Sequence, residues 1–477
     1  MIVDGPLTLA IAAQVATVTP QHLQELSKAE MIEIILEQHA LILQLQAQVA
    51  QLQAQIERLT GPPKDSSNSS LPPSQTRKGN RPGTKSSKKR GPQPGHRGCS
   101  RERQTPDTVV ECRPRNCARC GADLADAPGR LRGASQVVEI PPLRPVVIEA
   151  RRYQATCPHC GPRQAGQYPP GLELQRVFGP RRETLLCYFH HTQHVSYRRL
   201  ASLFRGLFGL NVSQGAIANV LARAARRLQP QAEAIRQPVR AHPVIASDET
   251  GARVAGRNHW QWVFETPTAS YHVIVPSRSR QEIEAVLGDA QPEVWLSDLF
   301  SAQLSAPAAR RQICHAHQLR DLQFAVDAER SAFAYRLQRL LLRAQRLHKR
   351  RDRLTPQLFS RQRADLEKIC DRLLAATPPG REARRLHKRY RKHREALFTF
   401  LYRDDVPPDN NGCERALRKS VIHRKVSGGF RSAWGAQAFA TLTTVIQTAG
   451  KRGQDALSAL TPHLAPSPAL TSPAQPP

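Results

Sequence analysis

The feature that most constrains this chain is a tract in its first quarter that is unable to form a hydrophobic core. Residues 61–107 consist mainly of Gly, Pro, Ser, Asn, Gln and basic residues, with eleven Lys or Arg against three acidic residues. Such a composition buries too little apolar surface to offset the entropy of ordering, so we predict a disordered, basic linker. The chain of 477 residues must then fold as separate parts on either side of it.

The chain as a whole is strongly basic, with a formal net charge of +31. Self-repulsion of this size opposes compaction, and the phosphate backbone of DNA is the natural counter-ion. A basic membrane-surface protein is the alternative, but it would need an amphipathic anchor or a spanning segment. The apolar stretch from Leu7 to Thr19 is too short to span and contains Gln14, so we expect no signal peptide, no membrane partner and a cytoplasmic location.

A heptad pattern precedes the linker and follows an N-terminal extension (1–27). Within residues 28–60 the apolar residues of the repeat are Ile35, Ile42, Val49 and Ile56 at one position and Leu45, Leu52 and Leu59 at the other. This pattern predicts a coiled coil, and β-branched residues at a with leucine at d favour a parallel dimer, so we expect a homodimer or higher oligomer. Gln38 interrupts one d position. The alternative is an amphipathic helix that packs on its own domain.

Four of the ten cysteines form two Cys-x-x-Cys-Gly pairs after the linker, namely Cys117 with Cys120 and Cys157 with Cys160. In a cytoplasmic protein this spacing favours metal over disulfides, and four thiolates suit one tetrahedral Zn²⁺. We predict a zinc-binding domain over 108–170, with strands at 137–140 and 146–148. The alternatives are unligated cysteines, or His159 in place of one cysteine ligand. We expect Cys112 to take no part.

Two amphipathic patterns flank a tight turn within residues 180–240. Apolar positions predict a first helix that ends near Gly209, and Ser213 is a suitable N-cap for a second helix that runs to Leu228. This arrangement predicts a helix-turn-helix whose second helix enters a DNA major groove. The candidate DNA-binding residues on it are Gln214, Asn219 and Arg223. An ordinary pair of packed helices fits the same pattern.

Short apolar strands and helices alternate from residue 241 to 330. The expected elements are strands at 243–248, 260–264 and 271–275, a helix at 280–287, strands at 293–298 and 312–314, and a helix at 317–329. This order is that of a ribonuclease H-like α/β fold. We predict such a core from 241–330 and 401–455, interrupted by a helical insertion at 331–400. Residues 456–477 are expected to form a disordered tail.

Three acidic residues of this region form a candidate metal site. Asp248 and Asp298 each follow an apolar strand, and Glu414 falls in the first turn of the helix that begins after Pro407 and Pro408. Carboxylates are the ligands that Mg²⁺ or Mn²⁺ prefers, and two such ions neutralise charge at phosphorus during phosphodiester transfer. A strand-end aspartate is more often a cap or a surface residue, so the pattern alone leaves both interpretations open.

The segments around these acids resemble the transposases of the insertion sequence 66 family. They are Asp248–Val254 with Trp260–Trp262, Cys314–Arg320, Asp409–Arg415 and Arg424–Gly428, and the order of parts from residue 30 to 455 is similar as well. The resemblance implies a DNA transposase with a ribonuclease H-like core, in which Asp248, Asp298 and Glu414 hold two divalent metal ions per active site. In the family a small residue and then an aromatic usually follow the second aspartate, whereas Leu299 and Phe300 follow Asp298 here.

The resemblance also implies partners for the chain. These are the terminal inverted repeats of the element and target DNA, bound by a bacterial, nucleoid-associated protein, and a need for accessory proteins of the same element stays open. The candidate phosphate-binding residues near the acids are His317, Arg320, Arg415, Arg418, Arg424 and Lys425, with plain surface charge as the alternative. A second zinc site at Cys314, His315 and His317 is crowded and is not favoured.

Three functions remain to be separated. The first is a transposase that cleaves DNA and joins the freed 3′-OH to target DNA. The second is a catalytically inactive, domesticated DNA-binding protein, against which the complete set of acids speaks. The third is a plain metal-dependent nuclease, which needs neither a dimerisation helix nor two DNA-reading modules.

Overall fold

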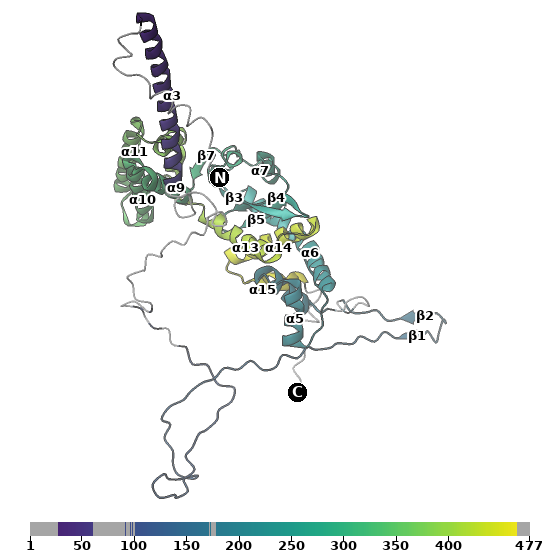
Figure 1. The fold of residues 1–477 in the computed structure, drawn as a ribbon. Helices are drawn as coiled ribbons and strands as arrows, with labels where there is room; N and C mark the ends of the chain where they lie inside the picture. Colours follow the sequence, from purple (N-terminus) through teal and green to yellow (C-terminus); the bar gives the residue numbers. More distant parts are fainter. Residues whose placement is uncertain are drawn as a thin grey trace. The chain divides into compact units, whose positions relative to one another are not determined.

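The computed structural model describes residues 27–60, 91, 96, 98, 101–170, 172 and 178–464. Residues 1–26 of the predicted extension (1–27), most of the basic linker (61–107) and the tail after residue 464 lie outside these residues. The chain divides into two compact units, a helical one that includes 318–343 and 364–392 and a larger one that carries the main sheet (Figure 1). No helix of the described part has both the length and the apolar character that a membrane crossing requires.

A five-stranded mixed sheet, in the order β5-β4-β3-β6-β7, is the centre of the larger unit. Its strands are β3 (Val244–Val254), β4 (Arg257–Glu265), β5 (Ser270–Val275), β6 (Val294–Ser297) and β7 (Arg310–Ile313). The first three form an antiparallel meander, and β6 and β7 run parallel to β3. The five predicted strands are confirmed. However, β3 does not end at Asp248, because β4 continues to pair with it as far as Val254.

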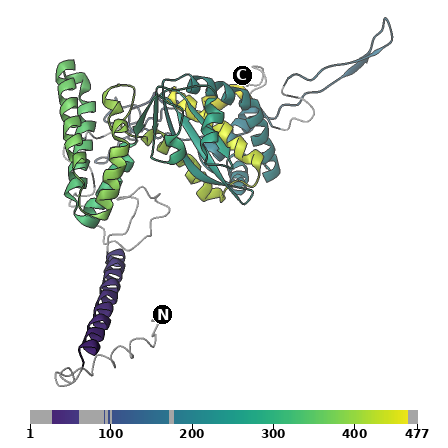
Figure 2. The ribbon, with the colours of Figure 1, turned by 90° about the horizontal axis from the view of Figure 1, so that it is seen from above.

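Helices cover both faces of this sheet. On one face Trp262, Phe264 and Trp295 are buried in a core with α6 (Gln214–Arg240) and α7 (Arg280–Leu287). Because successive side chains of a strand alternate between faces, Val263 lies on the other face, where it packs against α13 (Asn411–Ser427). Figures 1 and 2 show α13 and α14 (Ala433–Lys451) beside the sheet, and α14 contacts the edge strand β5.

The predicted helix pair is present as α5 (Tyr197–Phe208) and α6. Ser213 caps α6, accepting a hydrogen bond from the Ala216 N–H at 3.1 Å. α6 does not end at Leu228 but continues to Arg240, because Ile235 and Val239 stay buried in the same core. Two shorter elements, α4 (Pro180–Cys187) and the π-helix η2 (Tyr188–Thr192), precede α5.

The expectation of disorder after residue 455 is wrong for the segment up to 464. These residues form α15 (Ala456–Leu464), which contacts α4, α6 and α14. Leu460 and Leu464 are both buried. The four-residue spacing of these leucines places them on one face of a helix, which outweighs the Pro- and Ser-rich composition that follows.

The predicted insertion is helical, as expected. Its elements are α10 (Ala332–Lys349), α11 (Pro356–Ala375) and α12 (Arg381–Lys392), with short 3-10 turns at Arg351–Arg353, Arg394–Leu397 and Thr399–Leu401. The helix predicted at 317–329 precedes them as α9 (His315–Glu329). Within the helical unit, the Glu329 carboxylate accepts hydrogen bonds from the N–H groups of Glu382 and Ala383, at 2.7 and 3.1 Å. Arg389 pairs with Asp321 at 2.5 Å. The Glu329 bonds hold the start of α12 on the end of α9, and the Arg389–Asp321 pair joins the last turn of α12 to the first half of α9.

The helix α3 (Lys28–Thr60) covers the whole predicted heptad segment. By contrast, the strands expected at 137–140 and 146–148 do not form. Val137 and Val147 are 88% and 91% exposed. The paired strands in 101–170 are β1 (Gln154–Thr156) and β2 (Arg163–Ala165), which flank the second cysteine pair.

Candidate active site and cysteine loops

Two of the predicted acids lie where β3 leaves its parallel partner. Ala246 pairs with Leu296 in the last β3–β6 pair, so Asp248 and Asp298 follow two residues later in the same register. Side chains two residues apart share a face of a sheet, which places Asp248 on the face that α13 covers. The Asp298 carboxylate accepts a hydrogen bond from the Phe300 N–H at 2.9 Å, which holds it within its own loop.

Glu414 approaches the same face from the first turn of α13. Asn410, which precedes this helix, donates from its side chain to the Ser247 carbonyl at 2.8 Å and from its backbone N–H to the Cys314 sulfur at 3.1 Å. The start of α13 is thereby tied to β3 directly beside Asp248. Glu414 Oε1 lies 3.6 Å from His317 Nε2.

Burial and neighbouring carboxylates act on Asp248. Burial raises the pKa of Asp248 well above its usual value, and the negative charges of Glu249, Asp298 and Glu414 raise it further. A bound cation would stabilise the ionised form of such a carboxylate, and oxygen ligands of this kind fit Mg²⁺ or Mn²⁺. Among the described residues, however, no three Asp, Glu, His or Cys side chains are close enough to hold one ion. The charges of Asp298 and Glu414 therefore act on Asp248, but the three acids do not form a complete set of ligands around one ion in the described structure.

A buried network on the far side of β3 was not predicted. Glu249, which follows Asp248 and is 9% exposed, accepts hydrogen bonds from Arg278 Nε at 2.9 Å and from Gln303 Nε2 at 2.6 Å. Gln303 also donates to the Ser247 hydroxyl at 3.3 Å. The two residues that flank Asp248 are thus both held. No spacing in the sequence marks this network, because its members come from separate segments.

Phe300, the aromatic residue two positions after Asp298, belongs to the same network. The Arg278 guanidinium carbon lies 3.7 Å from the Phe300 ring centroid and 4.5 Å from that of Trp260. Because the Phe300 N–H also binds Asp298, the ring and the amide of one residue connect Arg278 to the loop of the second acid. These contacts belong to Phe300, the aromatic of the family pattern, and not to Leu299, which departs from it.

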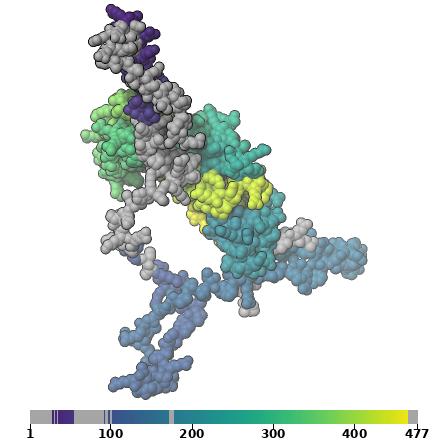
Figure 3. Space-filling view, in the orientation of Figure 1, coloured from purple at the N-terminus to yellow at the C-terminus, as the bar shows by residue number. Residues whose placement is uncertain are grey.

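The predicted basic residues of α13 divide into two groups. Arg415, Arg418 and Lys425 are exposed. Figure 3 shows the outer surface of this yellow-green segment uncovered. Arg424 is turned inward and donates to the Gly251 carbonyl of β3.

The predicted residues on α6 divide in a similar way. Gln214 and Asn219 are exposed, whereas Arg223 donates to the Glu183 carboxylate at 2.6 Å. The Glu183 side chain is only 3% exposed, so this pair belongs to the packing of α4 on α6. Arg320 is half-buried on α9.

The segment that was considered as a second zinc site is occupied by internal contacts. The Cys314 sulfur accepts the Asn410 N–H, and burial raises the pKa of its thiol to about 12. His315 Nε2 lies 2.7 Å from the Leu397 carbonyl oxygen, and burial lowers the pKa of this histidine to about 4.

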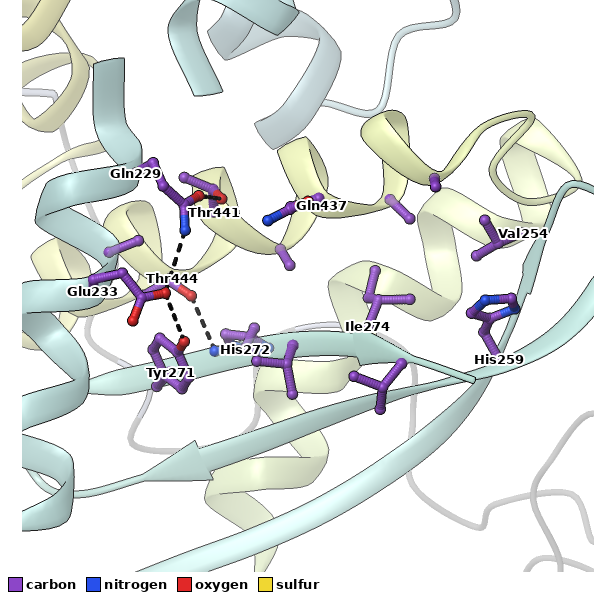
Figure 4. A pocket seen from close by; sticks show the side chains of 16 residues that line it. Gln229, Glu233, Val254, His259, Tyr271, His272, Ile274, Gln437, Thr441 and Thr444 are labelled. Atoms are coloured by element: carbon purple, nitrogen blue, oxygen red, sulfur yellow. Dashed lines mark hydrogen bonds between the residues drawn. The ribbon is translucent and has the colours of Figure 1, made fainter. Parts of the chain in front are cut away.

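A cleft of about 330 Å³ lies between β5, α6 and the first half of α14 (Figure 4). Within it Tyr271 donates to Glu233 at 3.1 Å, and the His272 N–H donates to the Thr444 hydroxyl at 3.0 Å. None of the three acids lines this cleft. It is therefore separate from the candidate catalytic site.

The two cysteine pairs form loops of the same backbone geometry. The Gly121 N–H donates to the Cys117 carbonyl at 2.9 Å, and the Gly161 N–H donates to the Cys157 carbonyl at 3.0 Å. Both glycines have a positive φ, +72° and +83°, which glycine adopts at little cost. The local fold of each loop is thus fixed by the glycine that follows its second cysteine.

The loops also favour thiolates. Backbone N–H groups within each loop lower the pKa of its first cysteine, Cys117 or Cys157, with the largest contributions from Arg119 and Cys160. Thiolate is the form that binds zinc, so the donor set fits this metal. The four sulfurs are not gathered around one point in the described structure.

Comparison with known families identifies the class of protein to which the chain belongs. Residues 175–438, more than half of the chain, match the family model described as Transposase IS66 family. Residues 114–161 match the zinc-finger binding domain of transposase IS66. A search of the curated proteins finds no match. The chain therefore belongs to the Transposase IS66 family, which confirms the resemblance seen in the sequence and supports a transposase role, DNA binding and zinc in the cysteine segment.

Proposed function

We propose that this chain cleaves DNA at the ends of an insertion sequence and transfers the freed strands to target DNA. The reaction is two-metal phosphoryl transfer with Asp248, Asp298 and Glu414 as the metal ligands. The observation that carries the proposal is the shared register of Asp248 and Asp298, with Glu414 on the helix that covers the same face. The strand order β5-β4-β3-β6-β7 also supports the ribonuclease H-like core expected over 241–330 and 401–455.

Two Mg²⁺ or Mn²⁺ ions supply charge neutralisation at phosphorus and an activated nucleophile when bound. The residues of this chain hold and orient the ligands. Asp248 sits on the central strand between two anchored neighbours, Ser247 and Glu249. Asp298 is held by its loop and Glu414 by the start of α13. Such fixed placement lowers the entropy lost on reaching the reactive geometry.

DNA contacts follow from the exposed cations on the same helix. Arg415, Arg418 and Lys425 are exposed on the helix that carries Glu414, which suits phosphate binding beside the scissile bond. His317 and Arg320 of α9 are proposed to contribute further contacts to DNA phosphates. Arg424 acts instead through its bond to the Gly251 carbonyl of β3.

Two further regions are proposed to bind the ends of the element. The exposed Gln214 and Asn219 read bases from α6 in a helix-turn-helix. Arg223 is assigned to this surface as well, although its ion pair with Glu183 limits its reach. The basic linker adds phosphate contacts without sequence preference.

The remaining modules are proposed to organise the assembly. One structural Zn²⁺ joins the two cysteine loops within 108–170. Two copies of α3 pair as a parallel coiled coil, and the helical insertion at 331–400 interrupts the core in sequence. Accessory proteins of the element and a cytoplasmic, nucleoid-associated location complete the proposal.

A strand-transfer assay tests it against both alternatives. Purified protein is incubated with Mg²⁺, DNA that carries the inverted repeats, and a target plasmid. A transposase yields both cleaved ends and joined product. Cleavage without joining would identify a plain nuclease, and binding without cleavage would identify an inactive, domesticated DNA-binding protein.

A further inference from the structure

A second buried carboxylate lies on the α13 face of the sheet and has no part in the proposed metal site. Glu265 of β4 is 6% exposed. Its Oε1 accepts a hydrogen bond from the Ser270 hydroxyl at 3.0 Å and lies 3.4 Å from Lys451 Nζ. A buried carboxylate with a hydroxyl donor and a cation on one oxygen has little freedom to move, since leaving either partner unpaired is costly.

The other oxygen of Glu265 lies directly under the first turn of α13. A Cβ placed on Gly412 would stand 2.9 Å from Glu265 Oε2, closer than Cβ atoms approach other atoms. Gly412 is the second residue of α13 and precedes Glu414 by two positions. On the sheet side, Glu265 pairs with Ala246, two residues before Asp248. The contact therefore joins the two segments that carry the first and third acids.

The electrostatics of this contact are favourable. The first turn of an α-helix carries partial positive charge on its unpaired N–H groups, and a carboxylate beside it is stabilising. Cys413, the next residue of the turn, is fully buried against Val263 and Leu417. The turn is thus held from two sides, by an apolar contact and by the Glu265 carboxylate.

We propose that Glu265 is a positioning residue, which sets the separation between the first turn of α13 and the sheet and thereby places Glu414 against Asp248. The inference rests on the proposed function, because it takes Glu414 as a metal ligand. Glycine at 412 is needed for this close approach. A methyl group there must either lift the turn from the sheet or push the carboxylate away from Ser270 and Lys451.

The test is Gly412→Ala, with the single-turnover cleavage rate and the affinity for the DNA ends measured separately. Cleavage is expected to fall at least about tenfold, since a misplacement of 1 Å costs roughly 10²-fold in rate. End affinity and melting temperature are expected to stay near wild type, which a purely structural role would not predict. The matched control is Gly450→Ala in α14, because a Cβ at Gly450 meets nothing within 4 Å.

A second-site variant tests the contact itself. Adding Glu265→Asp to Gly412→Ala shortens the acid by one methylene, makes room for the methyl group and is expected to restore most of the cleavage rate. Wild-type cleavage by Gly412→Ala would overturn the inference, as would a failure of Glu265→Asp to rescue it. If Gly412→Ala does not fold, Glu265→Gln, which adds no non-hydrogen atoms, takes its place. A wild-type cleavage rate in Glu265→Gln would also overturn the inference.

Asp248→Asn in the same assay distinguishes an error in the role of Glu265 from an error in the proposed metal site. If Asp248→Asn is inactive while Gly412→Ala cleaves normally, only the role of Glu265 is wrong. If Asp248→Asn cleaves like wild type, the proposed metal site itself is wrong.

Discussion

The sheet-bearing core and the cysteine segment contain similar strand-forming sequences, yet only the core builds a large sheet from them. Val294 and Trp295 of β6 are fully buried, whereas Val137 and Val147 are exposed and form no strand. β-Branched residues stabilise a strand through cross-strand pairs and a packed face. In the core, the neighbouring strands and the covering helices supply both. In 101–153 the described structure supplies neither, so this segment depends on something other than its own apolar residues.

The largest expected effect is the loss of order in the cysteine segment without zinc, which would test whether zinc stabilises this segment. The purified protein should carry about one zinc per chain, and Cys117→Ser should lose it together with the order of 108–170. In zinc-finger peptides metal binding contributes about 10–16 kcal/mol of folding free energy. Metal analysis of freshly reduced protein and limited proteolysis would measure both. The core should resist the protease, and the control Cys112→Ser should keep its zinc. Protein that is purified reduced, folded and without zinc would end this idea.

The next effect concerns the core alone. Asp248→Asn keeps the shape of the side chain but removes one negative ligand, so cleavage should fall by at least about 10²–10³-fold while end binding survives. Asp298→Asn and Glu414→Gln should behave in the same way, with zinc content unchanged. Cleavage and end binding are measured side by side at fixed salt.

A matched control for these variants is Asp404→Asn, because the Asp404 side chain is 73% exposed and its ion pair with Arg351 lies at the surface. Normal cleavage by Asp298→Asn together with loss in Asp289→Asn would show that the second acid has been misassigned.

A third effect concerns α3. Its apolar residues are exposed, as are those of the cysteine segment. Leu45 and Leu52 are 46% and 56% exposed. If a second copy covers them, Leu45→Lys with Leu52→Lys should convert the protein to a monomer, since each buried leucine contributes about 1.5–3 kcal/mol. Light scattering measures the mass. The control pair Gln44→Lys and Gln51→Lys adds the same charge outside the seam, and an equal mass for both pairs would mean that α3 packs elsewhere.

The smallest effect is an acid sensitivity of the core. His423 packs against Phe430 and Phe439, with ring centroids 5.3 and 4.5 Å apart, and burial together with the nearby histidines lowers its pKa to about 3. Its contribution to stability is complete above the unfolded-state pKa of about 6.5. As the pH falls towards 3, His423 binds a proton in the unfolded chain but stays neutral in the folded chain. The free energy of unfolding then drops by up to about 1.4 kcal/mol per pH unit.

His423→Phe retains the ring packing and removes the titration. Urea unfolding at pH 7, 6 and 5 should therefore show a shallower loss of stability in this variant than in the wild type. Identical slopes would assign the acid sensitivity to other buried groups, such as His272, whose pKa burial also lowers to about 3.

Much of this architecture could be predicted without coordinates. The strands of the main sheet, the helix Arg280–Leu287 and the helix pair α5–α6 follow from periodicity and capping, which act within a few residues of the chain. The cysteine spacing and the acidic segment around Glu414 were enough to indicate the family, which the family comparison confirms. The role of the three acids stays a prediction, to be tested by the variants above.

Other features depended on contacts between distant segments. α15 is ordered because Leu460 and Leu464 are buried against α4 and α6, which lie far from α15 in the sequence. Whether a basic residue faces outward, like Arg418, or inward, like Arg424, is set by the packing of α13 on β3. Residue type alone does not distinguish the two.

The sequence by itself determined the local elements, the cysteine loops and the identity of the candidate ligands, because these depend on short-range geometry and on side-chain chemistry. Only the tertiary structure decided that Asp248 and Asp298 each lie two residues beyond the last β3–β6 pair, and that Asn410 ties the helix of Glu414 to β3. It alone placed Glu265 beneath Gly412. The physical reason is that these contacts join segments up to 163 residues apart, and their free energies depend on burial and alignment that exist only once the sheet and its helices have packed.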